Sequence, residues 1–147
     1  MSRTLAVLLG AGAGCLVGMQ APINSRLGQS VGDIQAAAFS FLAGTVVLVA
    51  IAAVVRGGLG QLSHISSAPW WALIGGLLGA VYVSVALVAV RTLGAGGITA
   101  AVISGNLAIA VVIDRFGLFG VQRQPIDAAR VIGLVLLIAG VALVVRK

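Results

Sequence analysis

Five long apolar segments place the strongest constraint on how this chain can fold. They run from Thr4 to Gly28, Ile34 to Val55, Trp70 to Val90, Ile98 to Phe116, and Ala128 to Val145. Each is close to the length of about 20 apolar residues that a transmembrane helix needs. Only 8% of the 147 residues are charged, whereas soluble domains carry about 25%. The sequence predicts an all-α integral membrane protein, with residues 1–147 forming a single domain of five transmembrane helices.

Two alternatives to this interpretation are disfavoured by the residues themselves. Arg3 precedes the first segment, as in a signal peptide, but the segment continues past a plausible cleavage site to Pro22 and Asn24. A β-barrel would need alternating polar and apolar residues, which these segments lack. We expect a first helix in which Pro22 could introduce a kink, and a second helix capped by Asp33 or Ser30.

Small residues recur at helical spacing and indicate close helix packing. Gly10, Gly14 and Gly18 lie four residues apart, so they share one face of the first helix and would let another backbone approach. The alternative is that glycine and alanine are simply frequent in membrane helices. The glycines predicted to pack are Gly10, Gly14, Gly18, Gly75, Gly76, Gly79 and Gly105.

Uncharged polar groups inside the segments are the best candidates for a functional site. An amide in lipid is costly without a partner, so it usually faces a protein interior or a wet cavity. The predicted substrate pathway consists of Gln20, Asn24, Phe39, Ser40, Tyr82, Ser104 and Asn106. The alternative is interhelical hydrogen bonding that only holds the bundle together.

Catalytic and metal-binding motifs are not apparent. His64 lies in a polar connection without Cys or Glu nearby, and the single Cys15 allows no intrachain disulfide or cysteine metal site. The carboxylates Asp33, Asp114 and Asp127 lie at segment ends, where nothing suggests a converging acid–base pair. We predict no enzymatic activity, no catalytic residues, no metal and no cofactor.

The ends of the segments carry one candidate for coupling or gating. Proton-coupled carriers usually place an ionisable group within a span, and the central part of each segment here lacks one. Asp114, beside Arg115 at the end of the fourth segment, is the candidate substitute. A salt-bridged helix-end aspartate is the alternative.

The basic residues are divided almost evenly between the two sides of the membrane. Five spans place five of them on one side, namely Arg3, Arg56, Arg115, Arg123 and Arg130. The other side holds Arg26, Arg91, Arg146 and Lys147. Lys/Arg bias sets orientation, so we favour dual or weakly fixed topology; a single orientation fixed by other features is the alternative. The basic residues form no cluster, so no nucleic-acid partner is expected.

Several stretches resemble the YdcZ-type five-helix branch of the drug/metabolite transporter superfamily. They are GMQAPINSRLG at residues 18–28, FSFLAGTVVL at 39–48, WWALIGGLLGAVYV at 70–83, SGNLAIAVVIDRFGLFG at 104–120 and RVIGLVLLIAGVALV at 130–144. The residues that match the family's motifs are Gln20, Asn24, Trp70, Gly75, Gly76, Gly79, Tyr82, Asp114, Phe116 and Gly117. The chain departs from the family at Asn106, where Gln is common.

The resemblance implies half of an inverted-repeat transporter, with a second copy or a homologous five-helix chain in the opposite orientation. We therefore predict a secondary transporter or facilitator for a small organic solute, working as an antiparallel dimer by alternating access in the bacterial inner (cytoplasmic) membrane. Its partners would be the lipid bilayer, the solute and the second chain. The first four helices would surround the site, and the fifth would pack peripherally or in the dimer interface. The alternative is a non-transporting membrane subunit that stabilises or regulates a partner membrane protein.

Overall fold

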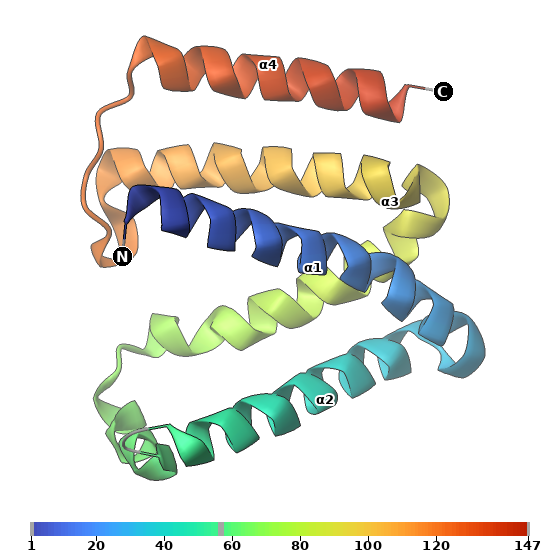
Figure 1. The fold of residues 1–147 in the computed structure, drawn as a ribbon, viewed down its shortest axis with the longest axis vertical. Helices are drawn as coiled ribbons and strands as arrows, with labels where there is room; N and C mark the ends of the chain where they lie inside the picture. The colour runs from blue at the N-terminus through green and yellow to red at the C-terminus, as the bar shows by residue number, and fades with distance from the viewer. Residues whose placement is uncertain (1, 56–57, 147) are drawn as a thin grey trace. The chain divides into compact units, whose positions relative to one another are not determined.

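All regular elements in the part of the chain that the structure describes are helical. The computed structural model describes residues 2–55 and 58–146, so Arg56 and Lys147, two of the basic residues counted above, lie outside the described residues. The elements are α1 (Arg3–Val31), α2 (Asp33–Val54), η1 (Gly58–Ser67), η2 (Trp70–Ile74), α3 (Gly75–Phe116), η3 (Leu118–Gly120) and α4 (Ala128–Val145), where η marks a 3-10 helix (Figure 1). No strand occurs in these two ranges, and the predicted all-α fold is confirmed.

The longest helix, α3, accounts for two of the five predicted spans. Its backbone leaves helical geometry at Gly94, where φ is 71° and ψ is 169°, a region that is essentially restricted to glycine. Together with η2 it forms an apolar stretch of 47 residues, Trp70–Phe116. A single crossing needs about 20 residues, so the helical segments before and after Gly94 correspond to the third and fourth spans. With α1, α2 and α4, the five predicted helices are confirmed.

Several local expectations differ from the structure. Gly32, with φ of 97°, occupies the N-cap position of α2 and makes no side-chain cap hydrogen bond, so the prediction that Asp33 or Ser30 caps this helix is wrong. The backbone of α1 stays helical through Pro22, so the helix reaches Val31. The connection after α2, whose glycines and serines favour a flexible loop, instead forms η1, in which Ser63 Oγ donates to the Gly60 carbonyl at 2.7 Å.

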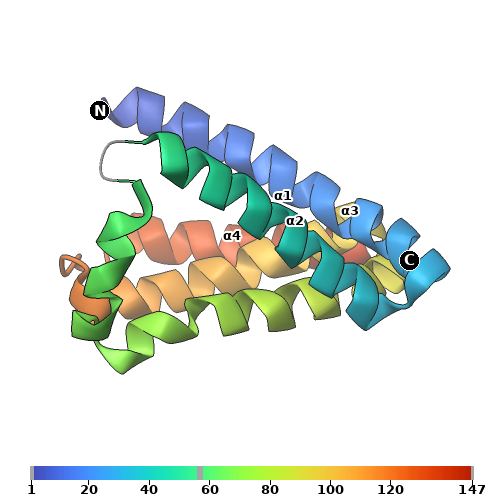
Figure 2. The ribbon, with the colours of Figure 1, turned by 90° about the horizontal axis from the view of Figure 1, so that it is seen from below.

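The chain divides after Arg91 into two compact units, which are described separately. In the first unit, α1 and α2 form a hairpin that turns at Gly32 (Figures 1 and 2). Ala37 of α2 packs with Val83 and Leu87 of α3, and the half-buried Tyr82 packs against this cluster. Leu87 is fully buried, so this cluster is the packed centre of the first unit.

The second unit pairs the later part of α3 with α4, and the two helices lie side by side (Figure 1). A Cβ atom added at Gly97 would lie 3.8 Å from Val145 Cγ2, so the end of α4 approaches the beginning of this part of α3. The α4 helix begins at Ala128, where the Asp127 side chain accepts from Arg130 N at 2.8 Å and caps the helix. The prediction of a single five-helix domain stays a prediction.

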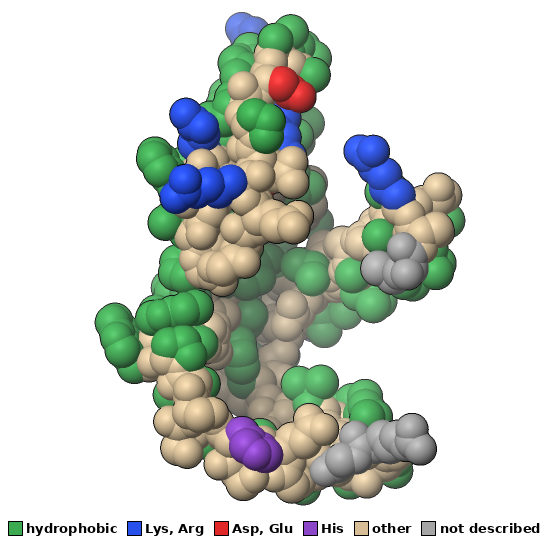
Figure 3. All heavy atoms as spheres, turned by 90° about the vertical axis from the view of Figure 1, so that its left-hand side faces the viewer, with side chains coloured by type: hydrophobic (Ala, Val, Ile, Leu, Met, Phe, Trp, Pro, Cys, Tyr) green, Lys and Arg blue, Asp and Glu red, His purple; other side chains and the backbone are tan. Residues whose placement is uncertain are grey.

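The outer surfaces of the helices are apolar. Leu16, Leu48, Leu77 and Leu136 are each more than 60% exposed, and Figure 3 shows apolar side chains over much of the face it displays. Within the apolar window of α4, 0% of the residues are buried. Exposed apolar surface of this extent is unfavourable in water, whereas lipid tails are as apolar as these side chains. These helices are therefore built to lie in a bilayer.

Candidate functional site

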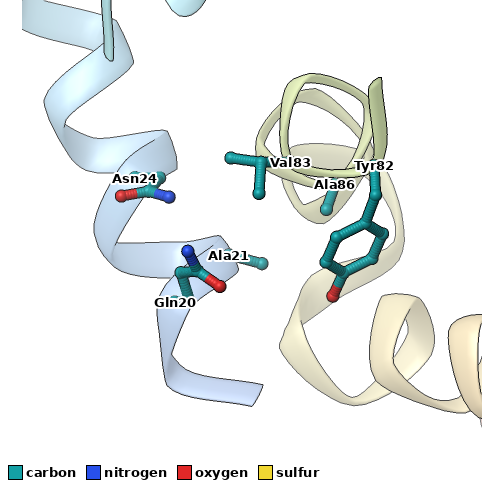
Figure 4. A pocket seen from close by; sticks show the side chains of 6 residues that line it. All are labelled: Gln20, Ala21, Asn24, Tyr82, Val83 and Ala86. Carbon is teal, nitrogen blue, oxygen red and sulfur yellow. The ribbon is translucent and has the colours of Figure 1, made fainter. Parts of the chain in front are cut away.

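A small uncharged recess lies between α1 and α3 in the first unit (Figure 4). Its lining residues are Gln20, Ala21 and Asn24 of α1 with Tyr82, Val83 and Ala86 of α3. Both helices contribute the same spacing of i, i+1 and i+4, which places three side chains on one helical face. The side chains lie so close together that the recess has no room for a water molecule. The structure thus brings together the two first-helix amides and the third-helix tyrosine that were predicted for the pathway.

Asn24 is the most deeply buried polar side chain of this recess. It is 5% exposed, and its Oδ1 accepts from Ser40 Oγ of α2 at 3.1 Å. Its Nδ2 is buried and has no hydrogen-bond partner within residues 2–55 and 58–146. Leaving a buried donor unpaired costs roughly 1–3 kcal/mol. The amide therefore sits in the recess at an energetic cost that its hydrogen bond to Ser40 offsets only in part.

The two predicted residues of α2 have different positions. Ser40 is half-buried and reaches Asn24 through the hydrogen bond described above. Phe39 is 61% exposed and does not line the recess. The neighbouring Phe41 instead packs against α3, because a Cβ atom at Gly79 would lie 3.2 Å from Phe41 Cζ. Ser40 is thus connected to the recess, and Phe39 is not.

Ser104 and Asn106 belong to the second unit. Ser104 is half-buried, and its hydroxyl oxygen is buried without a hydrogen-bond partner among the residues that the structure describes. Asn106 is exposed. Their assignment to the substrate pathway stays a prediction.

The predicted packing glycines differ in what surrounds them. Gly79 makes the close approach to Phe41, and a Cβ atom there would require the ring to move. Gly18 is half-buried. A Cβ atom at any of the others would meet no described atom of its own unit within 4 Å; these are Gly10, Gly14, Gly75, Gly76 and Gly105. The helix partner predicted for them stays a prediction.

An interhelical polar cluster that the sequence analysis did not identify lies next to the recess. We call Ser25, Asp33 and Arg91 the Arg91 cluster. Arg91 Nε donates to Ser25 Oγ at 3.0 Å, and Arg91 Nη2 donates to the Ser25 carbonyl at 3.3 Å. The two terminal guanidinium nitrogens each donate to one oxygen of Asp33, with Nη1 to Oδ2 at 3.1 Å and Nη2 to Oδ1. This forked pairing links the C-terminal part of α1, the start of α2 and the first part of α3.

Gly28 provides the space that the Arg91 cluster occupies. A Cβ atom at Gly28 would lie 2.5 Å from Asp33 Oδ1 and 3.1 Å from Arg91 Nη2. Real Cβ atoms do not approach other atoms so closely, so a larger residue would displace the ion pair. The ion pair could have been predicted from the sequence, because Asp33 and Arg91 have opposite charges and lie at segment ends that five spans place on the same side of the membrane.

The predicted coupling residues lie in the second unit, where Asp114 forms a helix-end salt bridge, as in the alternative given above. Asp114 Oδ2 accepts from Arg130 Nη1 at 3.0 Å, and its carbonyl accepts from Gln124 N at 2.9 Å. Its ion-pair partner is thus the arginine on the first turn of α4 rather than the adjacent Arg115, which is exposed. These contacts tie the connection between α3 and α4 to the end of α3. A role for Asp114 and Arg115 in coupling stays a prediction.

Metal-ligating side chains do not cluster within the described ranges. No group of three or more His, Cys, Asp or Glu residues that could hold a metal occurs there. His64 lies on η1 and is exposed. Cys15 is exposed on α1. The part of the chain that the structure describes therefore offers an uncharged polar recess as its candidate site.

The fold and this recess define the class of protein. The helices are long enough to span a bilayer and bury few apolar residues. Uncharged polar groups lie between two of them. This combination is typical of membrane proteins that bind or transport a solute.

Comparison with known proteins gives the family. Residues 5–143 match the family described as "Putative inner membrane exporter, YdcZ". The chain is 33% identical over 147 residues to "Inner membrane protein YdcZ" of Escherichia coli (strain K12), and the match covers 99% of this chain and 97% of that protein. The chain therefore belongs to the YdcZ family. No solved structure matches it.

Family membership establishes where the protein resides and the general class of its function. It is an integral protein of the bacterial inner membrane, with its helices in the lipid bilayer, and it belongs to a family of membrane transport proteins rather than of enzymes.

Proposed function

We propose that this protein is a secondary transporter or facilitator for a small organic solute, and that the recess between α1 and α3 forms part of its solute site. The observation that carries the proposal is the buried amide of Asn24, whose donor faces a recess inside a membrane protein without a partner among the described residues. Such groups usually mark a pathway when they occur in membrane helices.

The size of the recess supports the involvement of a second chain and of an opening movement. Small-molecule sites generally enclose about 300–1,000 Å³, whereas this recess is too tight to hold even a water molecule. In transporters built from inverted repeats, the site lies between the two repeats near the membrane midplane. We therefore propose an antiparallel dimer, in which a second copy contributes the other half of the site and alternating access opens it to either side.

The almost even division of basic residues between the two sides of the membrane agrees with this arrangement. A chain with little Lys/Arg bias has little preference for one orientation. Membership of the drug/metabolite transporter superfamily is part of the same proposal, because the resemblance described above implies that two five-helix units make one transporter.

Transport by reconstituted protein tests the proposal. Liposomes would be loaded with erythritol, N-acetylalaninamide, N-acetylalaninate or alaninamide, and efflux would be followed with radiolabelled solute. We expect at least one of these solutes to leave protein-containing liposomes faster than protein-free liposomes. Gln20→Ala should reduce this rate about tenfold or more, equivalent to about 1.4 kcal/mol, while the dimer persists.

Gln122→Ala is the matched control, because Gln122 is an exposed amide in the connection before α4. It should leave the transport rate unchanged. If protein-containing liposomes release every solute at the protein-free rate, the non-transporting subunit becomes the better interpretation. Loss of the dimer in Gln20→Ala would instead assign Gln20 to helix packing.

A further inference from the structure

The orientation of the Asn24 amide indicates what kind of group the recess can bind. Ser40 Oγ donates to Asn24 Oδ1, so the oxygen of the amide is directed at α2. Figure 4 shows the oxygen directed away from α3 and the nitrogen directed toward Val83, across the space between α1 and α3. The group presented to the recess is therefore a hydrogen-bond donor, and its complement is an acceptor.

The remainder of the recess is apolar or uncharged. Ala21 is 8% exposed, Val83 is 6% exposed and Ala86 is 3% exposed, and these small side chains form the wall next to the amide. Gln20 and Tyr82 complete the lining and carry no formal charge. A solute group in contact with Asn24 therefore also meets aliphatic surface, which favours small apolar substituents beside the acceptor.

The charged groups of the Arg91 cluster, which adjoins Asn24 through Ser25, are already paired. Ser25 follows Asn24 in the chain and accepts from Arg91, and Arg91 is paired with Asp33 by two hydrogen bonds. The guanidinium is therefore satisfied within the Arg91 cluster and is not available as a counter-charge for an anionic solute. A carboxylate or ammonium group placed in the recess would lose its hydration without gaining an opposite charge, which is strongly unfavourable.

We infer that the recess, once widened by the opening movement proposed above, takes an uncharged solute that carries a hydrogen-bond acceptor, such as an amide or ester carbonyl, next to small apolar groups. The acceptor receives a hydrogen bond from Asn24 Nδ2, and the apolar groups contact Val83 and Ala86. This inference rests on the proposed function, since it defines the class of solute for the same site. It excludes organic anions and cations from this recess.

The side-chain amide of Asn24 can report binding directly, because the chain contains only two asparagines, Asn24 and Asn106. Protein labelled with ¹⁵N-asparagine would be reconstituted in detergent micelles, and Asn106→Gln would assign the two side-chain amide signals. Three probes of the same branched skeleton would be titrated: neutral N,N-dimethylacetamide, anionic isobutyrate and cationic isobutyramidinium. N,N-dimethylacetamide has a carbonyl acceptor and no donor.

We expect N,N-dimethylacetamide to shift the Asn24 amide signal saturably and to leave the exposed Asn106 signal unchanged. Isobutyrate and isobutyramidinium should produce no saturable shift at the same concentrations. Ala86→Val, which narrows the recess without removing the amide, should weaken or abolish the response. The inference is overturned if N,N-dimethylacetamide leaves the Asn24 signal unchanged, or if either charged probe shifts it as strongly.

The outcomes separate this inference from the transport proposal. A saturable shift with N,N-dimethylacetamide, combined with no efflux of any solute from proteoliposomes, supports the recess as a binding site and contradicts transport. Efflux that depends on Gln20, combined with an unresponsive Asn24 signal, supports transport and contradicts the solute class assigned here. Efflux of N-acetylalaninate at the rate of N-acetylalaninamide would also contradict it.

Discussion

The hydrogen bond from Ser40 to Asn24 holds the recess amide in one orientation and joins α2 to α1. Ser40→Ala would leave Asn24 Oδ1 without its donor in a residue that is 5% exposed. Unpaired buried groups cost roughly 1–3 kcal/mol, and interhelical hydrogen bonds in membranes average about 0.6 kcal/mol. We expect Ser40→Ala to lower the free energy of unfolding by about 1 kcal/mol, measured by SDS titration in detergent micelles.

Thr45→Ala is the control for this change. The Thr45 hydroxyl donates at 2.8 Å to the Phe41 carbonyl of its own helix, and the residue is exposed. Removing the hydroxyl breaks only this hydrogen bond within α2, so the unfolding midpoint of Thr45→Ala should remain near that of the natural protein. Equal midpoints for Ser40→Ala and Thr45→Ala would show that the Asn24–Ser40 bond contributes nothing measurable.

Gly28 of α1 lies against the ion pair that Asp33 of α2 forms with Arg91 of α3. A Cβ atom there would meet Asp33 Oδ1 and Arg91 Nη2, so Gly28→Ala should separate the forked pair. The side chains of Arg91 and Asp33 are each 33% exposed. Solvent screening therefore reduces the stabilisation that the ion pair contributes. We expect Gly28→Ala to cost about 1–2 kcal/mol of stability, measured as a lower thermal unfolding temperature in detergent.

Gly12→Ala provides the matched substitution on the same helix. A Cβ atom at Gly12 would meet no described atom of its own unit within 4 Å. Alanine favours helix over glycine, so Gly12→Ala should leave the unfolding temperature unchanged or raise it. If Gly28→Ala melts at the same temperature as Gly12→Ala, the Arg91 cluster does not stabilise the first unit.

The helices were predictable to the extent that the apolar pattern and the membrane thickness determine them. The RTLGAGG connection at residues 91–97 contains Gly94, Gly96 and Gly97, and the pattern cannot distinguish which glycine interrupts the helix. Gly94 does so in the structure. The η1 helix was missed because its glycines and serines usually indicate turns, while local bonds such as Ser67 Oγ to the His64 carbonyl at 2.7 Å support a 3-10 helix.

The residues of the candidate site could be predicted where polar side chains interrupt an apolar membrane span. Gln20, Asn24 and Tyr82 stood out because amides and a phenol are unusual in apolar spans, and they line one recess. The Arg91 cluster was missed because Asp33 and Arg91 were interpreted only as helix-end charges. Helix-end charges acquire partners through tertiary packing, which the spacing within a single segment does not reveal.

For the molecule as a whole, the proposed transport mechanism depends on how the chain inserts into the membrane. An inverted pair requires both orientations to exist, and five spans place the two termini of every copy on opposite sides. In a Cys15→Ser background, one variant would carry Ser2→Cys and a second would carry a cysteine appended after Lys147. Each would be labelled in intact cells with a membrane-impermeant thiol reagent, with a permeant reagent giving the total.

If two orientations coexist, we expect about half of the copies to be labelled from outside at each terminus. Complete labelling at one terminus together with none at the other would show a single orientation, and it would contradict the inverted pairing of identical chains on which the proposed transport mechanism rests.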